Sequence, residues 1–229
     1  KNSTVKSLTR RGKYLILNLT PQNCLAIHLR MTGQLLLGNN PEKTRPCRIW
    51  LQFRTRNNKT VYLNFSDQRR FGRVYFAKNS NDIAGIKKLG PEPLSAEFKF
   101  DYFIRQLQKS KTPIKVLLLD QRFIAGIGNI YAQEALYLAH IAPQRAAQSL
   151  SLAEQRDLFK AIKKVLHKGI RLRGTSQRDY VDGFGKKGRA QDFLYVYNRS
   201  NGTCVNCGSK LTKLRIGGRG TTYCPKCQK

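Results

Sequence analysis

The sequence predicts an α+β protein in which antiparallel strands come first, helices follow and a metal-bound hairpin closes the chain. Three observations support this order. Short segments rich in β-branched and aromatic residues extend from Tyr14 to about Phe76. Helical periodicity replaces them beyond Gly90. Four of the six cysteines fall within the last 26 residues.

The first region contains six expected strands separated by turn-forming residues such as Pro, Gly and Asn. They are Tyr14–Leu19, Cys24–Leu29, Gln34–Leu37, Arg48–Phe53, Thr60–Phe65 and Arg73–Phe76. Short strands at this spacing are typical of an antiparallel sandwich or barrel. The polar and basic residues before Tyr14 show no apolar segment of the kind found in a signal peptide.

The helical region begins after the chain-breaking segment Gly90–Pro93. We expect a first helix to start at Ser95, whose side chain can cap it. Further helical patterns cover Ile114–Leu119, Asn129–Ala139 and Ser151–Arg173. The last of these opens with Ser151 and Glu154, the spacing of a capping box. Residues 174–192 are rich in glycine and basic side chains, and we expect a mobile loop there.

The cysteine pairs Cys204/Cys207 and Cys224/Cys227 have the spacing C-x2-C-x16-C-x2-C. This spacing predicts one tetrahedral Zn²⁺ bound by four thiolates, with a β-hairpin between the pairs. Such a shell leaves the metal no open position for a substrate, so its role is structural. The hairpin either only holds a small module together or also contacts a ligand through its basic residues.

The charge balance points to a polyanionic partner. The chain has 43 Lys and Arg against 13 Asp and Glu, a formal charge of +30. Self-repulsion of this size opposes compaction, and phosphate groups of nucleic acid are the leading compensating partner. No long apolar run indicates a membrane segment. Thiols in paired motifs favour a reducing cytosol.

A second informative segment runs from Leu117 to Ala132, where an apolar helix ends and a new one begins near Asn129 after Gly126 and Gly128. Backbone NH groups at such a helix start can bind an anion, to which Lys115 could add a charge. The alternative is an ordinary helical hairpin whose glycines only form the turn.

Several motifs in order along the chain carry a resemblance to a known family. They are Arg11–Tyr14, His28–Gly33, Asp67–Gly72, Leu89–Leu94, Leu119–Gln121, Ala125–Ala132, Gly174–Ser176 and Gly218–Cys224. With these motifs the chain resembles the formamidopyrimidine-DNA glycosylases, bacterial enzymes that remove 8-oxoguanine and ring-opened purines. The resemblance covers essentially the whole chain.

This resemblance implies a β-sandwich over residues 1–88 and a helix–two-turn–helix domain over 89–192, with a lesion-capping loop at 174–192. A four-cysteine zinc finger over 193–229 completes the expected organisation. The implied partner is double-stranded DNA that contains oxidised bases or abasic sites. The implied protein is a monomer located in the bacterial cytoplasm.

The resemblance also assigns roles to residues. Lys13 matches a lysine that acts on the abasic product, although a sheet-edge lysine is the plainer interpretation. Arg219 matches the zinc-finger arginine that contacts the phosphate beside the lesion. The motif residues that fill the gap left by an extruded base are Met31, Arg69 and Phe71.

For Met31 and Phe71 the plainer interpretation is core packing. Lys115 and Asn129 match residues that hold phosphates in the helix–two-turn–helix motif. Glu134 matches a family glutamate, and a solvated or helix-pairing role explains it equally well.

The sequence departs from the family pattern at its start. It begins Lys1-Asn-Ser-Thr-Val, where the family has an N-terminal proline nucleophile and an adjacent glutamate. We therefore expect a family member lacking its amino-terminal segment, which binds DNA but is inactive as a glycosylase, and whose sandwich exposes part of its core. Smaller departures lie near Pro46 and at Ser110, where the family has basic residues.

Three hypotheses remain open from the sequence. The first is a glycosylase and abasic-site lyase for oxidised purines, which must extrude the base to reach the glycosidic bond. The second is an endonuclease VIII-type enzyme for oxidised pyrimidines. The third is a noncatalytic, zinc-stabilised protein that binds damaged DNA.

Overall fold

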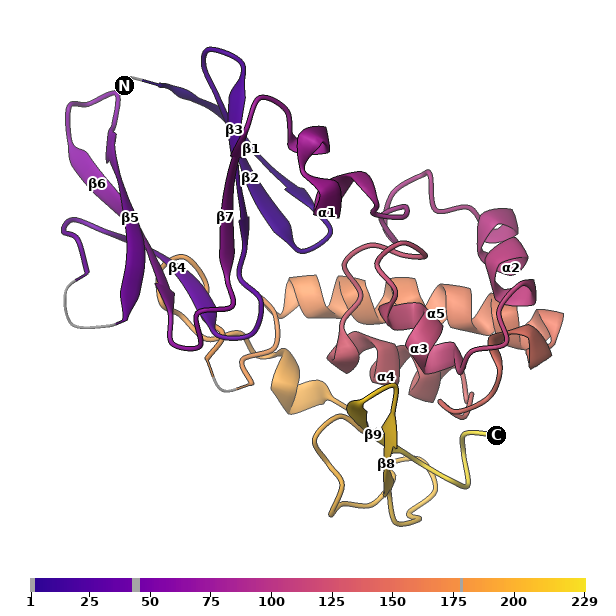
Figure 1. Cartoon of the computed structure of the whole chain (residues 1–229). Helices are drawn as coiled ribbons and strands as arrows, with labels where there is room; N and C mark the ends of the chain where they lie inside the picture. Colours follow the sequence, from indigo (N-terminus) through magenta and orange to yellow (C-terminus); the bar gives the residue numbers. More distant parts are fainter. Residues whose placement is uncertain (1–2, 43–45, 178) are drawn as a thin grey trace. The chain divides into compact units, whose positions relative to one another are not determined.

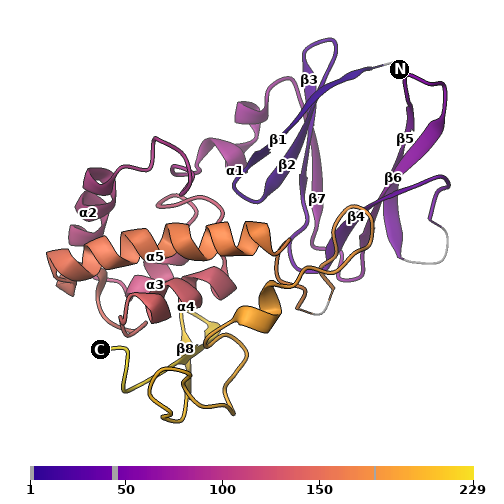
Figure 2. The same ribbon diagram turned by 180° about the vertical axis from the view of Figure 1, so that it is seen from behind.

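The computed structural model describes residues 3–42, 46–177 and 179–229, so parts of the expected sandwich and Arg178 of the expected loop lie outside the described residues. The chain divides into two compact units. The first consists of Lys1–Lys87 and Arg171–Asp192, and the second of Lys88–Ile170 and Phe193–Lys229. The loop thus groups with the strands and the cysteine-rich hairpin groups with the helices. Figure 1 and Figure 2 show the elements from two sides.

The first unit contains two antiparallel sheets. One has the strand order β1-β2-β3-β7 and the other β4-β6-β5. The strands are β1 (Val5–Arg11), β2 (Tyr14–Leu19), β3 (Asn23–His28), β4 (Gly33–Gly38), β5 (Cys47–Arg54), β6 (Thr60–Asp67) and β7 (Arg73–Ala77). A short 3-10 turn, η1 (Ser80–Asp82), and the single-turn α1 (Ala84–Lys87) follow β7.

The sheets pack face to face through their apolar side chains, which confirms the sandwich. Leu17 and Ile27 from one sheet form a buried cluster with Phe65 from the other. A groove of about 650 Å³ remains between the sheets, lined by residues of both, including Leu37 and Phe53. Apolar side chains therefore line an accessible groove as well as the closed core.

Two features of the sequence prediction need correction. β1 (Val5–Arg11) was not predicted, because its residues are mostly polar and only its antiparallel pairing with β2 makes it a strand. The helix expected to begin at Ser95 begins at Phe100 instead, after the N-cap residue Lys99. The Ser95 hydroxyl donates to the carbonyl of Glu92, so it stabilises a turn before the helix.

The second unit is built from helices and a terminal hairpin. Its elements are α2 (Phe100–Gln108), α3 (Ile114–Leu119), α4 (Asn129–Leu138), η2 (Ala147–Ser149), α5 (Leu152–Arg171), β8 (Thr212–Ile216) and β9 (Arg219–Tyr223). A 3-10 turn, η3 (Ala190–Phe193), lies at the junction of the loop with the hairpin module. In the described part of the chain, none of the helices is long and apolar enough to cross a membrane.

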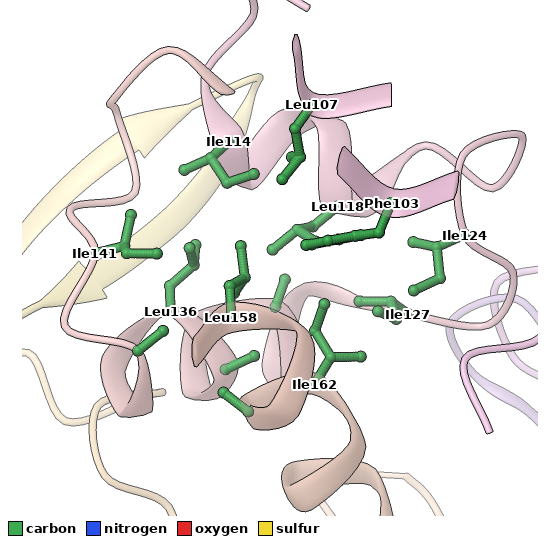
Figure 3. Close-up of a cluster of buried hydrophobic side chains, with 14 of the residues drawn as sticks. Phe103, Leu107, Ile114, Leu118, Ile124, Ile127, Leu136, Ile141, Leu158 and Ile162 are labelled. Carbon is green, nitrogen blue, oxygen red and sulfur yellow. The ribbon is translucent and has the colours of Figure 1, made fainter. Parts of the chain in front are cut away.

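The helices share one apolar core (Figure 3). Phe103, Ile114, Leu118, Leu136 and Leu158 are among its fully buried members and come from four different helices. Burial of large apolar side chains contributes about 1.5–3 kcal/mol each relative to exposure. This core gives the unit a rigid base from which the starts of α3 and α4 can present polar side chains.

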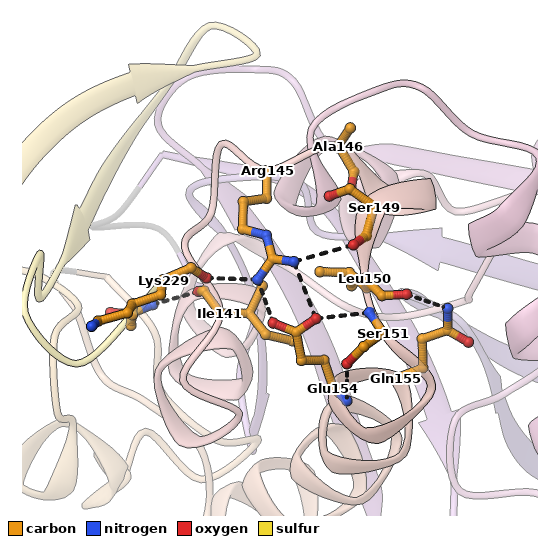
Figure 4. A network of polar contacts seen from close by, with 10 residues as sticks. Ile141, Arg145, Ala146, Ser149, Leu150, Ser151, Glu154, Gln155 and Lys229 are labelled. Carbon is orange, nitrogen blue, oxygen red and sulfur yellow. Dashed lines mark hydrogen bonds and ion pairs between the residues drawn. The ribbon is translucent and has the colours of Figure 1, made fainter.

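A polar network fixes the start of α5 (Figure 4). The backbone NH of Ser151 donates to a Glu154 carboxylate oxygen at 2.8 Å, and the NH of Glu154 donates to the Ser151 hydroxyl at 3.3 Å. This confirms the predicted capping box. Arg145 donates to the same carboxylate and to the backbone carbonyl of Lys229, so the chain end is held against the helical unit.

Candidate nucleic-acid interface

Met31, Arg69 and Phe71 gather at the ends of two turns of the sandwich. Met31 is 56% exposed in the β3–β4 turn, and Phe71 is 49% exposed in the β6–β7 turn. The Arg69 guanidinium lies 5.0 Å from the centre of the Phe71 ring, and its Nη1 lies 3.9 Å from the Met31 Sδ. The three side chains therefore form an exposed amphipathic group, which we call the wedge. Core packing is not the role of Met31 or Phe71 in this structure.

A buried carboxylate, which the sequence alone did not single out, holds the two turns of the wedge together. Asp67 accepts hydrogen bonds from the Thr32 hydroxyl at 2.5 Å, the Gly72 NH at 2.6 Å and the Arg69 NH at 3.2 Å. Burial by itself would raise the pKa of Asp67, but these hydrogen bonds lower it below its ordinary value. The signal that could have revealed it is its place at the start of the Asp67–Gly72 motif.

Gly72 is needed next to this carboxylate. A Cβ atom built at Gly72 would lie 2.4 Å from the Phe65 ring and 3.1 Å from an Asp67 carboxylate oxygen. Any side chain there would displace either the core ring or the carboxylate. The turn that carries Phe71 therefore depends on a glycine immediately after it.

Lys13 lies at the tight turn between β1 and β2, where its side chain is exposed and borders the groove between the sheets. The preceding Gly12 has φ of +55°, a conformation that favours glycine. His28, at the end of β3, packs edge-on against Tyr14 with 4.7 Å between ring centres. Burial, followed by the charges of Arg30 and Lys13, lowers the pKa of His28 to about 4.

The loop at residues 174–192 lies along β4. The backbone NH of Leu37 donates to the carbonyl of Gly183 at 2.9 Å, and the Gln34 amide donates to the carbonyl of Asp179. Inside the loop, the Ser176 hydroxyl donates to the Tyr180 carbonyl and accepts from the Gly188 NH, both at 2.8 Å. The described part of the loop is thus hydrogen-bonded both to β4 and within itself, and it lies along the edge of the second sheet.

A pocket of about 480 Å³ lies between this loop and the ends of β4 and β6. Its lining includes Thr32, Ser66 and Gln68 from the sandwich and Asp179 and Lys187 from the loop. Among the described residues, the hydroxyl of Ser66 is buried without a hydrogen-bond partner. Thr32 adjoins Met31, so the pocket begins directly beside the wedge. Its volume is within the range of about 300–1,000 Å³ that suits a small organic group.

Lys115 and Asn129 come together in the helical unit, but Lys115 is fully buried. Its ammonium donates to the carbonyl of Gly220 at 3.2 Å and to the Thr221 hydroxyl. Burial, and to a smaller extent the charge of Arg219, lower the pKa of Lys115 to about 8. The ammonium faces the hairpin rather than solvent, so a phosphate contact by Lys115 stays a prediction that would require its exposure.

Asn129 is the first residue of α4, and its amide also donates to the Gly220 carbonyl, at 3.2 Å. Its side-chain oxygen is buried and has no partner among the described residues. A third donor, the amide of Gln133, lies 3.4 Å from the same carbonyl. Gln133 was missed at the level of sequence, although its position four residues after Asn129 places both on one face of α4.

Glu134 has a role that neither sequence interpretation anticipated. Its carboxylate is buried and accepts the backbone NH groups of Tyr195 at 2.7 Å, Val196 at 3.0 Å and Tyr197 at 2.9 Å. It therefore anchors the segment that enters the zinc module to α4. The solvated and helix-pairing alternatives do not describe this contact.

The four predicted metal ligands, Cys204, Cys207, Cys224 and Cys227, converge at the base of the hairpin. Their Sγ atoms all lie within 4.8 Å of one another. The Cys204–Cys227 and Cys207–Cys224 sulfur distances are 3.8 and 3.5 Å. Thiolates about 2.3 Å from a tetrahedral zinc are separated by about 3.8 Å, so the set fits Zn²⁺.

Two neighbours donate hydrogen bonds toward these sulfurs. The Tyr137 hydroxyl on α4 lies 3.3 Å from the Cys204 Sγ, and the Asn206 amide lies 3.4 Å from the Cys227 Sγ. Such contacts orient metal ligands and offset the negative charge of a four-thiolate site.

Arg219 is the first residue of β9 and is exposed. The preceding Gly217 and Gly218 have φ of +56° and +74°, values that permit a tight turn between β8 and β9. The hairpin thus presents Arg219 at its tip, beside the buried Lys115. An exposed guanidinium at this point can form two hydrogen bonds to a phosphate.

Comparison with protein families identifies three regions of the chain. The formamidopyrimidine-DNA glycosylase N-terminal domain matches residues 1–74, and the H2TH domain of the same enzymes matches residues 89–181. The zinc finger found in FPG and IleRS matches residues 202–229. The chain belongs to the formamidopyrimidine-DNA glycosylase family. Zinc is accordingly the structural metal of the four-cysteine site.

Individual family members are similar over nearly the whole chain. The formamidopyrimidine-DNA glycosylase of Pelotomaculum thermopropionicum is 45% identical over 224 residues, covering 96% of this chain and 79% of its own length. The Listeria innocua enzyme of the same name is 40% identical, covering 98% and 82%.

Solved structures show the same fold. The crystal structure of MutM (Fpg) from Thermus thermophilus matches with a TM-score of 0.90 at 39% identity, covering 100% of this chain and 84% of that one. A Lactococcus lactis Fpg in complex with Fapy-dG-containing DNA matches with a TM-score of 0.90 at 33% identity, covering 100% and 83%.

Proposed function

We propose that the protein to which these residues belong is a base-excision DNA-repair glycosylase with abasic-site lyase activity, acting on oxidised purines such as 8-oxoguanine and formamidopyrimidines in duplex DNA. The N-terminal proline and glutamate on which the glycosylase step depends are absent from this sequence. The observation that carries the proposal is the exposed wedge of Met31, Arg69 and Phe71. Apolar side chains of this kind insert between base pairs and unstack them. A guanidinium beside them can pair with the base that loses its partner.

The pocket beside the wedge supports base extrusion. An enzyme that acts on a base must take it out of the stack and into a pocket of its own. The space under residues 179–187 offers polar groups from Thr32, Ser66 and Lys187 to such a base. We propose that this pocket receives the extruded purine and that the loop at residues 174–192 covers it.

Lys13 supports the lyase part of the proposal. Its amine is exposed at a tight turn of the same unit. A lysine amine can attack an aldehyde to form a Schiff base with loss of water, which promotes elimination of the neighbouring phosphate. We propose that Lys13 acts on the ring-opened sugar of the abasic product.

The remaining charges support binding to the DNA backbone. Arg219 at the hairpin tip and Asn129 at the start of α4 are the residues we place at phosphates. A formal charge of +30 adds a strong and salt-dependent attraction to DNA. Relatives solved with Fapy-dG and abasic-site DNA agree with this partner.

The test uses the 229-residue chain with duplexes that carry one 8-oxoguanine, one 5-hydroxycytosine or one abasic site. We expect this chain to bind the abasic duplex more tightly than the intact duplex and the 8-oxoguanine duplex more tightly than the 5-hydroxycytosine duplex. We also expect it to cleave at the abasic site in a reaction that Lys13→Ala reduces, without excising 8-oxoguanine, because the N-terminal proline and glutamate are absent. Preference for 5-hydroxycytosine would instead identify a pyrimidine enzyme. Tighter binding to the abasic duplex without any strand cleavage would favour a noncatalytic damage-binding protein.

A further inference from the structure

The edge of β9 that faces α4 carries backbone polar groups of a kind that need partners. β9 belongs to a two-stranded sheet with β8, in which Arg215 lies opposite Gly220 and Lys213 opposite Thr222. The Gly220 carbonyl and the Thr222 NH both point from this edge to α4. An unpaired strand edge of this kind normally needs a further strand or a covering group.

The side chain of Gln133 provides that group. Its Oε1 accepts the Thr222 NH at 2.6 Å, and its Nε2 lies 3.4 Å from the Gly220 carbonyl. One amide thus satisfies a donor and an acceptor two residues apart, as the backbone NH and carbonyl of a single residue in a third strand would. Gln133 is 2% exposed. A buried amide is costly unless its hydrogen bonds are made, so loss of either bond would disturb the contact.

The same contact surrounds the backbone of Arg219. The Lys115 ammonium donates to the Thr221 hydroxyl, which in turn donates to the Arg219 carbonyl at 3.1 Å. Lys115, Asn129 and Gln133 all donate to the Gly220 carbonyl. The carbonyl of Gly220, the residue that follows Arg219, therefore accepts hydrogen bonds from three side chains of the helices. Figure 1 shows β9 beside α4 in this unit.

We propose that Gln133 is a positioning residue for Arg219: by pairing with the edge of β9 it fixes the direction in which the hairpin presents that guanidinium to DNA. Without Gln133 the contact at Thr222 is lost. The strand is then held from the helices by Lys115 and Asn129, at Gly220 and Thr221, about which it can pivot. Arg219 would then spend less time in contact with its phosphate. The inference rests on the DNA-binding part of the proposed function.

The test is a double-mutant cycle on duplex binding, with Gln133→Leu, Arg219→Ala and the double variant measured over a series of salt concentrations. Loss of one phosphate contact lowers the slope of log affinity against log salt by about 0.9. We expect each single variant to weaken binding roughly tenfold and to lower the slope by that amount. In the Arg219→Ala background, Gln133→Leu should have no further effect.

The control is Gln155→Leu. Gln155 is also a buried glutamine of the helical unit, and its amide donates to the Leu150 carbonyl, away from the hairpin. The Gln155→Leu variant should leave the slope of log affinity against log salt unchanged, even if it lowers the melting temperature. The zinc content is measured for every variant, so that weaker binding caused by loss of the metal can be distinguished from weaker binding caused by displacement of Arg219.

The outcomes are distinguishable. Additive losses from Gln133→Leu and Arg219→Ala would overturn the positioning role. If Gln133→Leu does not retain one zinc per chain, the cycle is repeated with Gln133→Glu, which keeps the acceptor for Thr222 and loses the donor. Additivity there would overturn the inference equally. Failure of the unmodified chain to bind duplex DNA would instead contradict the proposed function.

Discussion

The Asp67 carboxylate accepts a 2.5 Å hydrogen bond from the Thr32 hydroxyl, and this contact joins the two turns that carry the wedge. Met31 precedes Thr32 in the first turn, while Arg69 and Phe71 follow Asp67 in the second. Because the carboxylate also accepts backbone NH groups of the second turn, it fixes the separation of the exposed side chains. The buried Asp67 thus supports the wedge, whose exposed side chains are the main basis of the proposed function.

Asp67→Asn should therefore destabilise the sandwich and weaken recognition of damaged DNA together. The amide cannot accept all three hydrogen bonds, and loss of charged hydrogen bonds at a buried site costs about 3 kcal/mol. The only tryptophan, Trp50 on β5, lies in the same unit, so its fluorescence during urea unfolding reports this loss. Asp157→Asn, at an exposed position of α5, is the control. Equal midpoints for the two variants would contradict the scaffold role.

Phe71→Ala should reduce binding to damaged DNA without lowering stability. The ring is half exposed, so its removal costs little folding energy, whereas stacking of an aromatic ring on a base contributes about 1–3 kcal/mol. The measurement compares affinity for abasic and intact duplexes by fluorescence anisotropy. The matched control is Phe76→Ala, because Phe76 on β7 is more exposed and lies outside the wedge. A similar loss in both variants would remove Phe71 from the site.

The strands show how far local sequence predicts the fold. Five of the six predicted strands match β3–β7 within one or two residues, and the sixth coincides with β2 (Tyr14–Leu19). β1 was missed because its only large apolar residues, Val5 and Leu8, are three positions apart and do not alternate with polar residues. Its strand conformation comes from backbone pairing with β2, which a local pattern does not contain.

In the candidate site, too, features set by a local sequence pattern could be predicted, whereas contacts between distant segments could not. The spacing of the cysteines predicted the metal ligands, because both pairs lie on short local turns. The wedge residues were named through the family resemblance, and the structure shows that they gather at one place. Asp67 was missed because its contact with Thr32 joins two separate turns, and Gln133 because its partners lie on the hairpin. Gln133 and Thr222 are 89 residues apart in the chain.

The pKa of His28 predicts a loss of stability in mild acid. In the unfolded chain the imidazole binds a proton near pH 6.5, whereas in the folded chain it does so only near pH 4. Between these values the unfolded state binds more protons, so stability falls as the pH falls. Urea midpoints from Trp50 fluorescence should therefore decrease as the pH is lowered from about 6.5 to about 5.

His28→Asn should flatten this dependence, because asparagine has no group that titrates in this pH range. Asparagine is chosen because its side-chain oxygen can still accept the hydrogen bond that the Arg30 NH donates to His28 Nδ1 at 3.0 Å. His167→Asn, on α5 of the other unit, should retain the dependence of the unmodified chain. An unchanged slope in His28→Asn would assign the acid sensitivity to other groups.

Removal of zinc should abolish tight DNA binding while the helices persist. The hairpin has a small apolar cluster that includes Cys204 and Cys224, so the metal contributes most of its folding energy. The main helical core is a separate cluster. After chelation, helical circular dichroism should remain and duplex affinity should fall, and added Zn²⁺ should restore it. Full affinity of the metal-free chain would show that the hairpin does not contact DNA.

Lys115→Met should show whether Lys115 acts through its hydrogen bonds to the hairpin or through its positive charge. The folded-state pKa of Lys115 is about 8, below its ordinary value of 10.5, so between these values the unfolded chain binds more protons. The free energy of unfolding of the unmodified chain therefore receives a contribution from Lys115 that increases as the pH rises through this interval, and the variant lacks this contribution. Methionine removes the burial cost of the ammonium but also its hydrogen bonds to Gly220 and Thr221. These effects oppose each other, so we expect a change in stability at neutral pH within about 1 kcal/mol.

DNA affinity should nevertheless fall in Lys115→Met, because the backbone beside Arg219 loses one of its supports. The measurements are thermal unfolding of the helical signal at about pH 7, 8 and 10, and duplex affinity at neutral pH. Lys111→Met, which changes an exposed lysine that precedes the same helix, is the control for loss of one positive charge. If both variants weaken binding equally, only the charge matters. A larger loss for the buried Lys115 than for the exposed Lys111 is the result that supports a positional role.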